Sequence, residues 1–265
     1  MLTEAQVSQF HRDGYLHGSR VLTDEQVERL RAEIQRVIDD VKKDGVPQPV
    51  LLRNLNGDNA QSPVWQIVNI WEASNPFRDL LVFNKKIAEE MSQLTGASQL
   101  RIWHDQVQYK PPLYGGTTMW HQDAPLWPII APMTEVSAWV ALDDVDVSNG
   151  CMWMVPGSHT WGNHMDYIRQ NVPNFDAMPT EFEGHVVEKR PCPVRKGEVH
   201  FHHALTWHGS PDNKSDRPRR AIAIHYMTGE THYVSAGNHP MKAFVEVQDG
   251  EVMRGDHFPL VWGNN

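Results

Sequence analysis

Two titratable side chains, His121 and Asp123, stand two positions apart in the aromatic and proline-containing stretch 117–128. On a β-strand, residues i and i+2 point to the same face, so both side chains would project into the interior. One imidazole and one carboxylate make up two thirds of the 2-His-1-carboxylate triad, which holds iron(II) and leaves coordination positions open. A hydrogen-bonded His–Asp pair at the rim of a barrel would explain the same tripeptide, so this pair alone leaves both interpretations open.

A second stretch supplies a third candidate ligand, His208, within the sequence HGS at 208–210. Arg219 follows eleven residues later, near the start of an expected strand. If the intervening loop returns as an antiparallel strand, Arg219 comes back close to His208. Arginine binds a carboxylate through two parallel hydrogen bonds, with better geometry than lysine. We therefore expect a small dicarboxylate that chelates iron at one end and meets Arg219 at the other.

The elements that position these residues change in kind near Gly96. Before it, capping residues and apolar residues at helical spacing predict three helices, over 4–13, from Thr23 to a stop at 45–47, and over 76–94. After it, short runs rich in β-branched and aromatic residues predict strands over 100–110, 136–145, 151–155, 198–203 and 220–227. Helices followed by many short strands indicate an α+β fold whose strands close into a sandwich or jelly roll.

Five motifs occur in a specific order along the chain. They are YKPP (109–112), WHQD (120–123), NGCMWMVPGSH (149–159), HGSPDNKSDRPRRA (208–221) and GDHFP (255–259). With them, the chain resembles the phytanoyl-CoA dioxygenase family of iron(II)- and 2-oxoglutarate-dependent oxygenases over about residues 3–260. The resemblance implies a double-stranded β-helix (jelly-roll, cupin-like) core with N-terminal helices packed on one side. We expect one domain over 1–265, mainly helical over 1–95 and jelly roll over 96–265.

The resemblance also implies roles for individual residues. His121, Asp123 and His208 would be the catalytic iron ligands, and Arg219 would bind the distal carboxylate of 2-oxoglutarate. Further residues expected at the cosubstrate are Ser210, Trp139, Gln108 and Lys110. Residues expected at the substrate are His104, which shares a strand face with Gln106, Gln108 and Lys110, and Trp127, Gln66 and Asn69. For each of these additional residues, an ordinary core or rim position is the competing interpretation.

Other histidines compete with His208 for the third ligand position, namely His200, His202, His203 and His225. His225 shares a face with Arg219 on a regular strand, so it is expected near the same pocket. We favour His208 because it alone has the glycine, serine and arginine at the distances that the family pattern requires.

The activity implied by the resemblance is the oxidation, by dioxygen, of a small or medium-sized molecule. Hydroxylation would accompany decarboxylation of 2-oxoglutarate to succinate, and the carboxylate of Asp123 excludes the halogenase branch, in which a small residue replaces it. The alternative enzyme is a cupin-like isomerase or hydrolase that uses the same ligands without 2-oxoglutarate. A metal-binding barrel without turnover is the non-enzymatic alternative.

Composition limits the partners and the compartment. The formal net charge of −9 argues against nucleic-acid binding, which usually needs a basic patch. No apolar run reaches the roughly eighteen residues of a spanning helix, and the N-terminus lacks the pattern of a signal peptide. Only two cysteines occur, which suits a reducing compartment. We expect a cytoplasmic enzyme with a small-molecule substrate and no membrane partner, while the sequence leaves the oligomeric state open.

Overall fold

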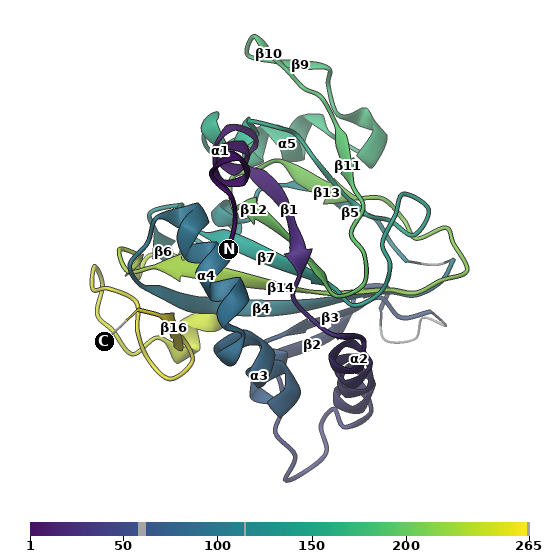
Figure 1. The fold of residues 1–265 in the computed structure, drawn as a ribbon, viewed down its shortest axis with the longest axis vertical. Coiled ribbons are helices and arrows are strands. Elements are labelled where there is room, and N and C mark those ends of the chain that lie inside the picture. Colours follow the sequence, from purple (N-terminus) through teal and green to yellow (C-terminus); the bar gives the residue numbers. More distant parts are fainter. Residues whose placement is uncertain (58–61, 114, 264–265) are drawn as a thin grey trace.

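The fold, in a computed structural model that describes residues 1–57, 62–113 and 115–263, is a jelly roll of two antiparallel sheets (Figure 1). Within these residues the large sheet has eight strands in the order β1-β12-β7-β14-β4-β3-β2, with β16 also paired to β4. Their bounds are β1 Tyr15–Arg20, β2 Leu51–Asn54, β3 Trp65–Val68, β4 Leu100–Lys110, β7 Val136–Ala141, β12 Glu198–His203, β14 Arg219–Thr228 and β16 Leu260–Trp262.

The second sheet has four strands among the described residues, in the order β11-β8-β13-β5. Their bounds are β5 Thr118–His121, β8 Met152–Met154, β11 Arg190–Cys192 and β13 His208–Ser210. Two short pairs lie outside both sheets, β9 Glu181–Phe182 with β10 His185–Val186, and β6 Ile130–Ala131 with β15 His232–Tyr233. The predicted double-stranded β-helix fold is therefore confirmed, and the space between its sheets is available for a site.

Helices cover the outer face of the large sheet (Figure 1). They are α1 Glu4–Asp13, α2 Asp24–Asp39, α3 Asn75–Phe83 and α4 Lys85–Thr95. Their apolar sides and the outward residues of β7 and β14, such as Val140, Ile222 and Ile224, form the largest buried apolar cluster. Because side chains alternate along a strand, the odd-numbered residues of these two strands point the other way, toward the second sheet. Helix packing on one face thus fixes which side chains line the interior.

Strand β4 changes faces at a β-bulge. The register with β14 shifts so that His104 pairs with His225 while Ile102 pairs with Tyr226, which leaves Trp103 without a partner position. Before the bulge Ile102 packs in the helix-facing core, and after it Val107 does. A bulge inserts one extra residue and so reverses the alternation. As a result His104, Gln106 and Gln108 point into the space between the sheets, as predicted.

The predicted helix over 4–13 is confirmed, the helix predicted from Thr23 to a stop at 45–47 ends earlier, at Asp39, and the third predicted helix is two helices. Thr3 and Thr23 form capping boxes with Gln6 and Gln26, and Gly14 ends α1 in the left-handed conformation. The predicted helix over 76–94 is interrupted at Asn84, whose ψ of 87° is not helical. Its side chain accepts a hydrogen bond from the Ile87 amide at 3.3 Å and so begins a new helix.

Segment 1–95 is also less helical than expected, since β1, β2 and β3 lie within it and join the large sheet. The predicted strands over 100–110 and 198–203 match β4 and β12, whereas the strand predicted over 136–145 ends at Ala141. The remaining elements are α5 Met165–Asn171 and five 3₁₀ turns, η1 Ile70–Glu72, η2 Ala124–Leu126, η3 Ser158–Thr160, η4 Phe175–Ala177 and η5 Pro240–Phe244.

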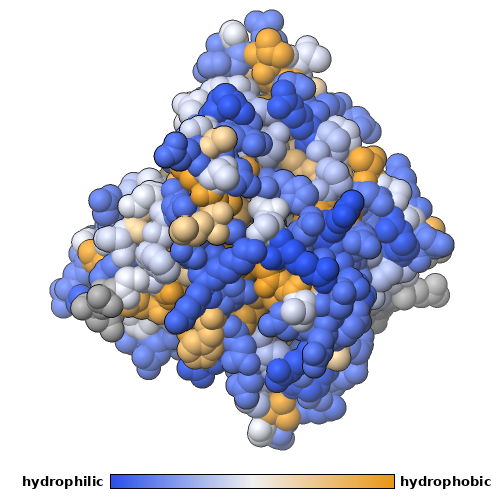
Figure 2. All heavy atoms as spheres, in the orientation of Figure 1, coloured by the Kyte–Doolittle hydropathy of each residue, from blue (hydrophilic) through white to orange (hydrophobic). Residues whose placement is uncertain are grey.

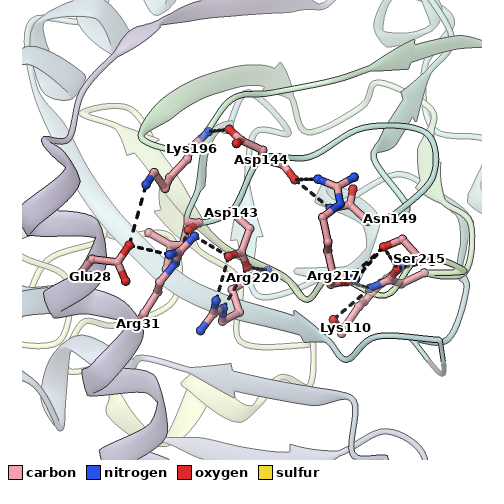
Figure 3. A network of polar contacts seen from close by, with 12 residues as sticks. Glu28, Arg31, Lys110, Asp143, Asp144, Asn149, Lys196, Ser215, Arg217 and Arg220 are labelled. Atoms are coloured by element: carbon pink, nitrogen blue, oxygen red, sulfur yellow. Dashed lines mark hydrogen bonds and ion pairs between the residues drawn. The ribbon is translucent and has the colours of Figure 1, made fainter.

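A polar network ties α2 to the start of β14 (Figure 3). The carboxylate of Asp143 accepts hydrogen bonds from the Arg31 guanidinium at 2.5 Å and from the Arg220 guanidinium at 2.8 and 2.9 Å. It also accepts one from the Arg220 backbone amide at 2.8 Å. Bidentate arginine–carboxylate pairs fix geometry as well as adding energy. The network therefore holds the backbone at 219–220, where a predicted site residue begins the strand.

The surface drawn in Figure 2 is mostly hydrophilic, and its apolar residues form small separate groups. In the part of the chain that the structure describes, no helix is both long enough and apolar enough to cross a membrane.

Candidate metal centre and its cavity

Three predicted ligands come together between the two sheets. His121 ends β5, and His208 begins β13 directly opposite it in the strand register. One ligand atom from each of His121, Asp123 and His208 lies within 4.8 Å of the other two. The Asp123 Oδ1 atom is 3.4 Å from Nε2 of His121 and 3.6 Å from Nε2 of His208. The structure therefore brings two imidazoles and one carboxylate to a single point.

Asp123 reaches this point in a different way from the one predicted. It does not continue the strand of His121, because its backbone is helical (φ −74°, ψ −51°) and it precedes the turn η2. The amides of Asp123 and Ala124 both donate to the carbonyl of Ala204, at 2.8 and 3.1 Å. Pro125 at the start of the turn suits this geometry, since its fixed φ is compatible with a helical turn. The expectation of two side chains alternating on one strand was wrong, although both ligands face the same space.

Hydrogen bonds select the ring nitrogen that faces the centre. Nδ1 of His121 lies 2.7 Å from the carbonyl of Met119, and Nδ1 of His208 lies 2.8 Å from the carbonyl of Thr206. A carbonyl only accepts, so each Nδ1 carries the hydrogen and each Nε2 keeps its lone pair. Metal-binding histidines generally have their second nitrogen held in this way. The donor set and its tautomers fit iron(II).

The electrostatics of the centre also suit a cation. Burial would raise the pKa of Asp123, but interaction with His208 and hydrogen bonds from His121 and His202 hold it well below its ordinary value. Burial and the proximity of His121 lower the pKa of His208 to about 3. The site therefore presents a carboxylate and at least one neutral imidazole near neutral pH, which are the forms that bind a metal.

The second oxygen of Asp123 is held by two residues of the large sheet. Nε2 of His202 lies 3.3 Å from Oδ2, and Oγ of Ser137 lies 3.5 Å from it. Ser137 is also 2.6 Å from Nδ1 of His225. The sequence reasoning considered His202 only as a competing ligand and missed Ser137. Period-two alternation on β7 and β12 could have indicated both, because Ser137 shares a face with Trp139 and His202 shares one with His200.

A cavity of about 280 Å³ contains the three ligands. It is lined by Gln66, His104, Gln106, Gln108, Thr118, Met119, His121, Asp123, Leu126, Trp127, Trp139, Met152, His202, His208, Gly209, Ser210, Ala223 and His225. Apart from the three ligands and Arg219, eight site residues were predicted; six of them line the cavity, and two, Lys110 and Asn69, do not. The cavity lies between the two sheets, and residues of both sheets line it.

One end of the cavity lies next to two buried basic side chains, those of Arg219 and Lys110. The side chain of Arg219 is fully buried, with its guanidinium 4.9 Å from the Trp139 ring centroid and Nη1 3.3 Å from Oε1 of Gln108. Its Nε and Nη2 atoms have no hydrogen-bond partner among the described residues. Unpaired buried donors are costly, and a carboxylate would satisfy both of them. Burial lowers the pKa of Arg219 to about 10, which leaves it charged at neutral pH.

Lys110 is the second basic side chain, and it reaches the cavity only through its hydrogen bond to Ser210. Its Nζ atom donates to Oγ of Ser210 at 2.6 Å and to the carbonyl of Pro211 at 2.8 Å. Lys110 itself does not line the cavity, whereas Ser210 does. Burial and the proximity of Arg219 lower the pKa of Lys110 well below its ordinary value. Lys110 therefore orients the Ser210 hydroxyl rather than contacting the cavity directly.

Asn69 is the one predicted substrate residue that the structure puts elsewhere. It is fully buried and does not line the cavity. Its amide nitrogen donates to Glu72 at 2.7 Å, and its amide oxygen accepts from the Asp105 backbone at 3.2 Å. With φ of 53° it occupies the left-handed region, which asparagine tolerates better than most residues. The local hydrogen bonds and backbone conformation therefore explain why an asparagine occupies position 69.

Glu135 is a buried carboxyl group that contacts the same loop as Asp123. Its carbonyl accepts from the Ala204 amide at 2.9 Å, but neither side-chain oxygen has a partner among the described residues. Burial raises the pKa of Glu135 to about 8. A glutamate in the unfolded chain has a pKa near 4.3. Between about pH 4 and pH 8, Glu135 therefore keeps its proton in the folded state and loses it in the unfolded state. Stability is therefore lost as the pH rises through this window.

We expect Glu135→Gln to remove this loss. One pKa unit corresponds to about 1.4 kcal/mol. The difference in unfolding free energy between the variant and the parent should therefore be about 3 kcal/mol larger, in favour of the variant, at about pH 8 than at about pH 5. Urea unfolding of both proteins at the two pH values measures the difference. Glu25→Gln, at an exposed position on α2, serves as the control and should track the parent. A Glu135→Gln difference that is the same at both pH values would contradict the prediction.

Comparison with known proteins agrees with this geometry. A family model described as "Phytanoyl-CoA dioxygenase (PhyH)" matches residues 10–221. The peroxisomal phytanoyl-CoA dioxygenase of Mus musculus is 27% identical over 242 residues, which are 85% of this chain and 68% of that protein. The ectoine dioxygenase of Bordetella parapertussis is 25% identical over 256 residues, 86% of this chain and 76% of that protein.

Solved structures of similar enzymes cover nearly the whole chain. The non-heme alpha ketoglutarate dependent carbocyclase SnoK from nogalamycin biosynthesis superposes with a TM-score of 0.77 at 26% identity, covering 98% of this chain and 96% of SnoK. The epimerase SnoN, in complex with Fe³⁺, alpha ketoglutarate and nogalamycin RO, superposes with a TM-score of 0.76 at 27% identity, covering 97% and 98%. These similarities extend over both sheets and the helical layer.

Proposed function

Since this chain belongs to the phytanoyl-CoA dioxygenase family, we propose that it hydroxylates a small or medium-sized molecule at the cavity between its sheets. Its cofactors are iron(II), 2-oxoglutarate as cosubstrate, and dioxygen. The proposal rests on the His121–Asp123–His208 cluster in a cavity whose lining includes Trp139 and Gln108, the two residues that contact the buried guanidinium of Arg219. Two nitrogen atoms of that guanidinium have no hydrogen-bond partner among the described residues. The cluster fits an iron site and the guanidinium fits a carboxylate.

The residues have separate roles in this proposal. His121, Asp123 and His208 hold iron on one side and leave the other side open. Arg219 binds the distal carboxylate of 2-oxoglutarate, and the Ser210 hydroxyl, oriented by Lys110, lies in the same cavity. With iron and 2-oxoglutarate bound, the centre supplies oxidation by dioxygen, coupled to decarboxylation of 2-oxoglutarate to succinate. The aromatic walls at Trp127 and Trp139 limit the access of water to it.

The rival enzyme, a cupin-like isomerase or hydrolase, would need the same three ligands but neither 2-oxoglutarate nor Arg219. The family match and the orphaned guanidinium both favour the oxygenase. The reaction outcome is a separate matter, because the similar structures include a carbocyclase and an epimerase. Hydroxylation is therefore the part of the proposal that product analysis must test.

Anaerobic titration of the iron(II) protein with 2-oxoglutarate tests the proposal. We expect a weak visible charge-transfer band that saturates at one equivalent, because chelation of iron by the 1-carboxylate and the 2-oxo group produces such a band. Succinate should then form on admission of air together with a substrate. A protein that holds stoichiometric iron yet shows no band with 2-oxoglutarate would refute the oxygenase proposal and favour the cupin-like alternative.

A further inference from the structure

One part of the cavity is lined neither by an iron ligand nor by Arg219. We call it the substrate end and define it by the lining residues Gln66, His104, Gln106, Leu126, Trp127 and His225. It is assembled from β3, β4, the η2 turn and β14, with His104 and His225 directly opposite each other in the strand register. Its chemistry decides which molecules fit beside the metal.

Formal charge is missing from the substrate end. Of the lining residues within the described chain, Asp123 is the one carboxylate, and no lysine or arginine is among them. Burial holds the pKa of His104 well below its ordinary value, and burial lowers the pKa of His225 to about 4. Both imidazoles are therefore neutral at physiological pH. Arg53 contacts Gln66 but is exposed and does not line the cavity. A charged group placed here would lose its hydration without gaining a partner of opposite charge among the residues of the substrate end, which costs several kcal/mol.

His104 presents a hydrogen-bond acceptor. Its Nδ1 atom lies 3.3 Å from the carbonyl of Asp105, and because a carbonyl only accepts, Nδ1 carries the hydrogen. Nε2 is then a lone-pair acceptor, and it is buried without a partner in the described part of the chain. The residue is 3% exposed and lines the cavity. A ligand with a hydroxyl or N–H group can donate a hydrogen bond to this acceptor.

The neighbouring strand of the same sheet supplies a donor. Oε1 of Gln66 accepts a hydrogen bond from Nε of Arg53 at 2.5 Å. Arginine has no acceptor, so the amide oxygen of Gln66 must face Arg53. The amide NH₂ group of Gln66 can then donate a hydrogen bond to a ligand in the cavity. A ligand oxygen is the natural partner for this group. Donor and acceptor thus come from two neighbouring strands, β3 and β4.

Aromatic rings bound the same space. The ring centroids of Trp127 and His225 are 4.7 Å apart with an interplanar angle of 60°, and those of Trp127 and His104 are 5.6 Å apart at 87°. Rings at such angles form a corner with both ring faces and ring edges available, which favours a flat or cyclic apolar body. Leu126, 38% exposed, adds an apolar surface at the opening.

We propose, on the basis of the oxygenase function above, that the substrate is an uncharged ring compound carrying a hydroxyl or N–H group that donates to Nε2 of His104. Carboxylates, phosphate esters and acyl-CoA thioesters are excluded from the substrate end by their charge or by their charged appendages. His104 is then the specificity-determining residue, since its Nε2 atom accepts a hydrogen bond from the substrate and analogues without a donor bind more weakly.

Ligand-observed NMR on the anaerobic iron(II)–2-oxoglutarate enzyme tests this directly. The probes are small ring compounds in matched sets, for example phenol, 1-naphthol and indole against phenyl phosphate, 1-naphthyl phosphate and indole-3-carboxylate, with toluene as the neutral analogue lacking a donor. We expect the hydroxyl and N–H members to bind, and the anions and toluene to bind at least about tenfold more weakly. Equal or better binding of the anions, or no binding of any neutral donor, would overturn the proposal.

Two variants locate the effect at His104. His104→Phe keeps a ring but removes the acceptor, so neutral donors should lose about tenfold in affinity and become equal to toluene. His104→Gln restores an acceptor and should recover the preference. His232→Phe, outside the cavity on β15, is the matched control and should behave like the parent. A His104→Phe variant that keeps the donor preference would also overturn the proposal.

The 2-oxoglutarate charge-transfer band separates this proposal from the function on which it rests. His104→Phe should still form the band, because within the described part of the chain the His104 side chain makes no hydrogen bond to an iron ligand or to Arg219. If the parent protein forms no band, the oxygenase function fails. If the band forms and anionic rings are preferred, the assignment of a neutral substrate alone fails.

Discussion

Asp123→Ala should lose iron, with an affinity reduced by more than about 100-fold, because outer-shell changes alone typically cost 10–100-fold. The substitution removes the one carboxylate that lies within reach of both His121 and His208. It also leaves His202 without its partner on Oδ2. Iron content after anaerobic reconstitution and desalting measures the loss, and 2-oxoglutarate should then produce no charge-transfer band.

The control for this experiment is Asp166→Ala, at an exposed position on α5. It should bind iron as the parent does. Circular dichroism of Asp123→Ala is expected to match the parent, since the backbone of residue 123 is held by the Ala204 carbonyl and not by its own side chain. If Asp123→Ala retains one equivalent of iron and full activity, Asp123 is not a ligand.

Arg219→Ala should weaken 2-oxoglutarate binding by about 30-fold or more while leaving iron affinity unchanged. Truncating one partner of a buried, hydrogen-bonded charge pair typically costs 2–5 kcal/mol. The loss falls on the distal carboxylate, because Nε and Nη2 of Arg219 are buried donors that have no hydrogen-bond partner among the described residues. Anaerobic titration gives the dissociation constant, and succinate formation gives the Michaelis constant for 2-oxoglutarate.

Two further substitutions refine this result. Arg219→Lys should bind 2-oxoglutarate with intermediate affinity, since lysine keeps the charge but not the planar pair of donors. Arg217→Ala removes an arginine only two residues away, which contacts Asp144 (Figure 3) and pairs with Asp146 at the surface, and it should leave the affinity unchanged. Unchanged 2-oxoglutarate affinity in Arg219→Ala would mean that the cosubstrate binds elsewhere or not at all.

The sequence was most informative where function restricts residue type and spacing together. Short motifs pointed to His121, His208 and Arg219 as candidates, and composition predicted the strand that Arg219 begins, although not the short strand β13 that carries His208. The inward face of β4 was predicted correctly as well, although the reason for it was not. Period-two alternation from Leu100 would have placed His104 on the same side as Ile102, and only the bulge at Trp103 separates them.

The remaining differences arise from tertiary contacts that local patterns do not contain. The helix break at Asn84 depends on a side-chain cap that competes with continuation of the helix. The position of Asp123 depends on the carbonyl of Ala204, a residue 81 positions later in the chain. Gln66 faces the cavity because β3 pairs with β4, whereas Asn69, three residues on, turns into the core.

The bonds that orient the iron ligands come largely from the main chain. Carbonyls of Met119, Thr206 and Ala204 hold the ligands His121, His208 and Asp123 in place. In the substrate end, His225 is linked to Asp123 through Ser137, whereas the side chains of Gln66, Gln106 and Leu126 take no part in these bonds. Mutations at Gln66, Gln106 or Leu126 can therefore accumulate without disturbing the bonds that orient the iron ligands. Such a division makes this chain a favourable starting point for directed evolution, in which substrate preference is varied while the oxidative chemistry is inherited intact.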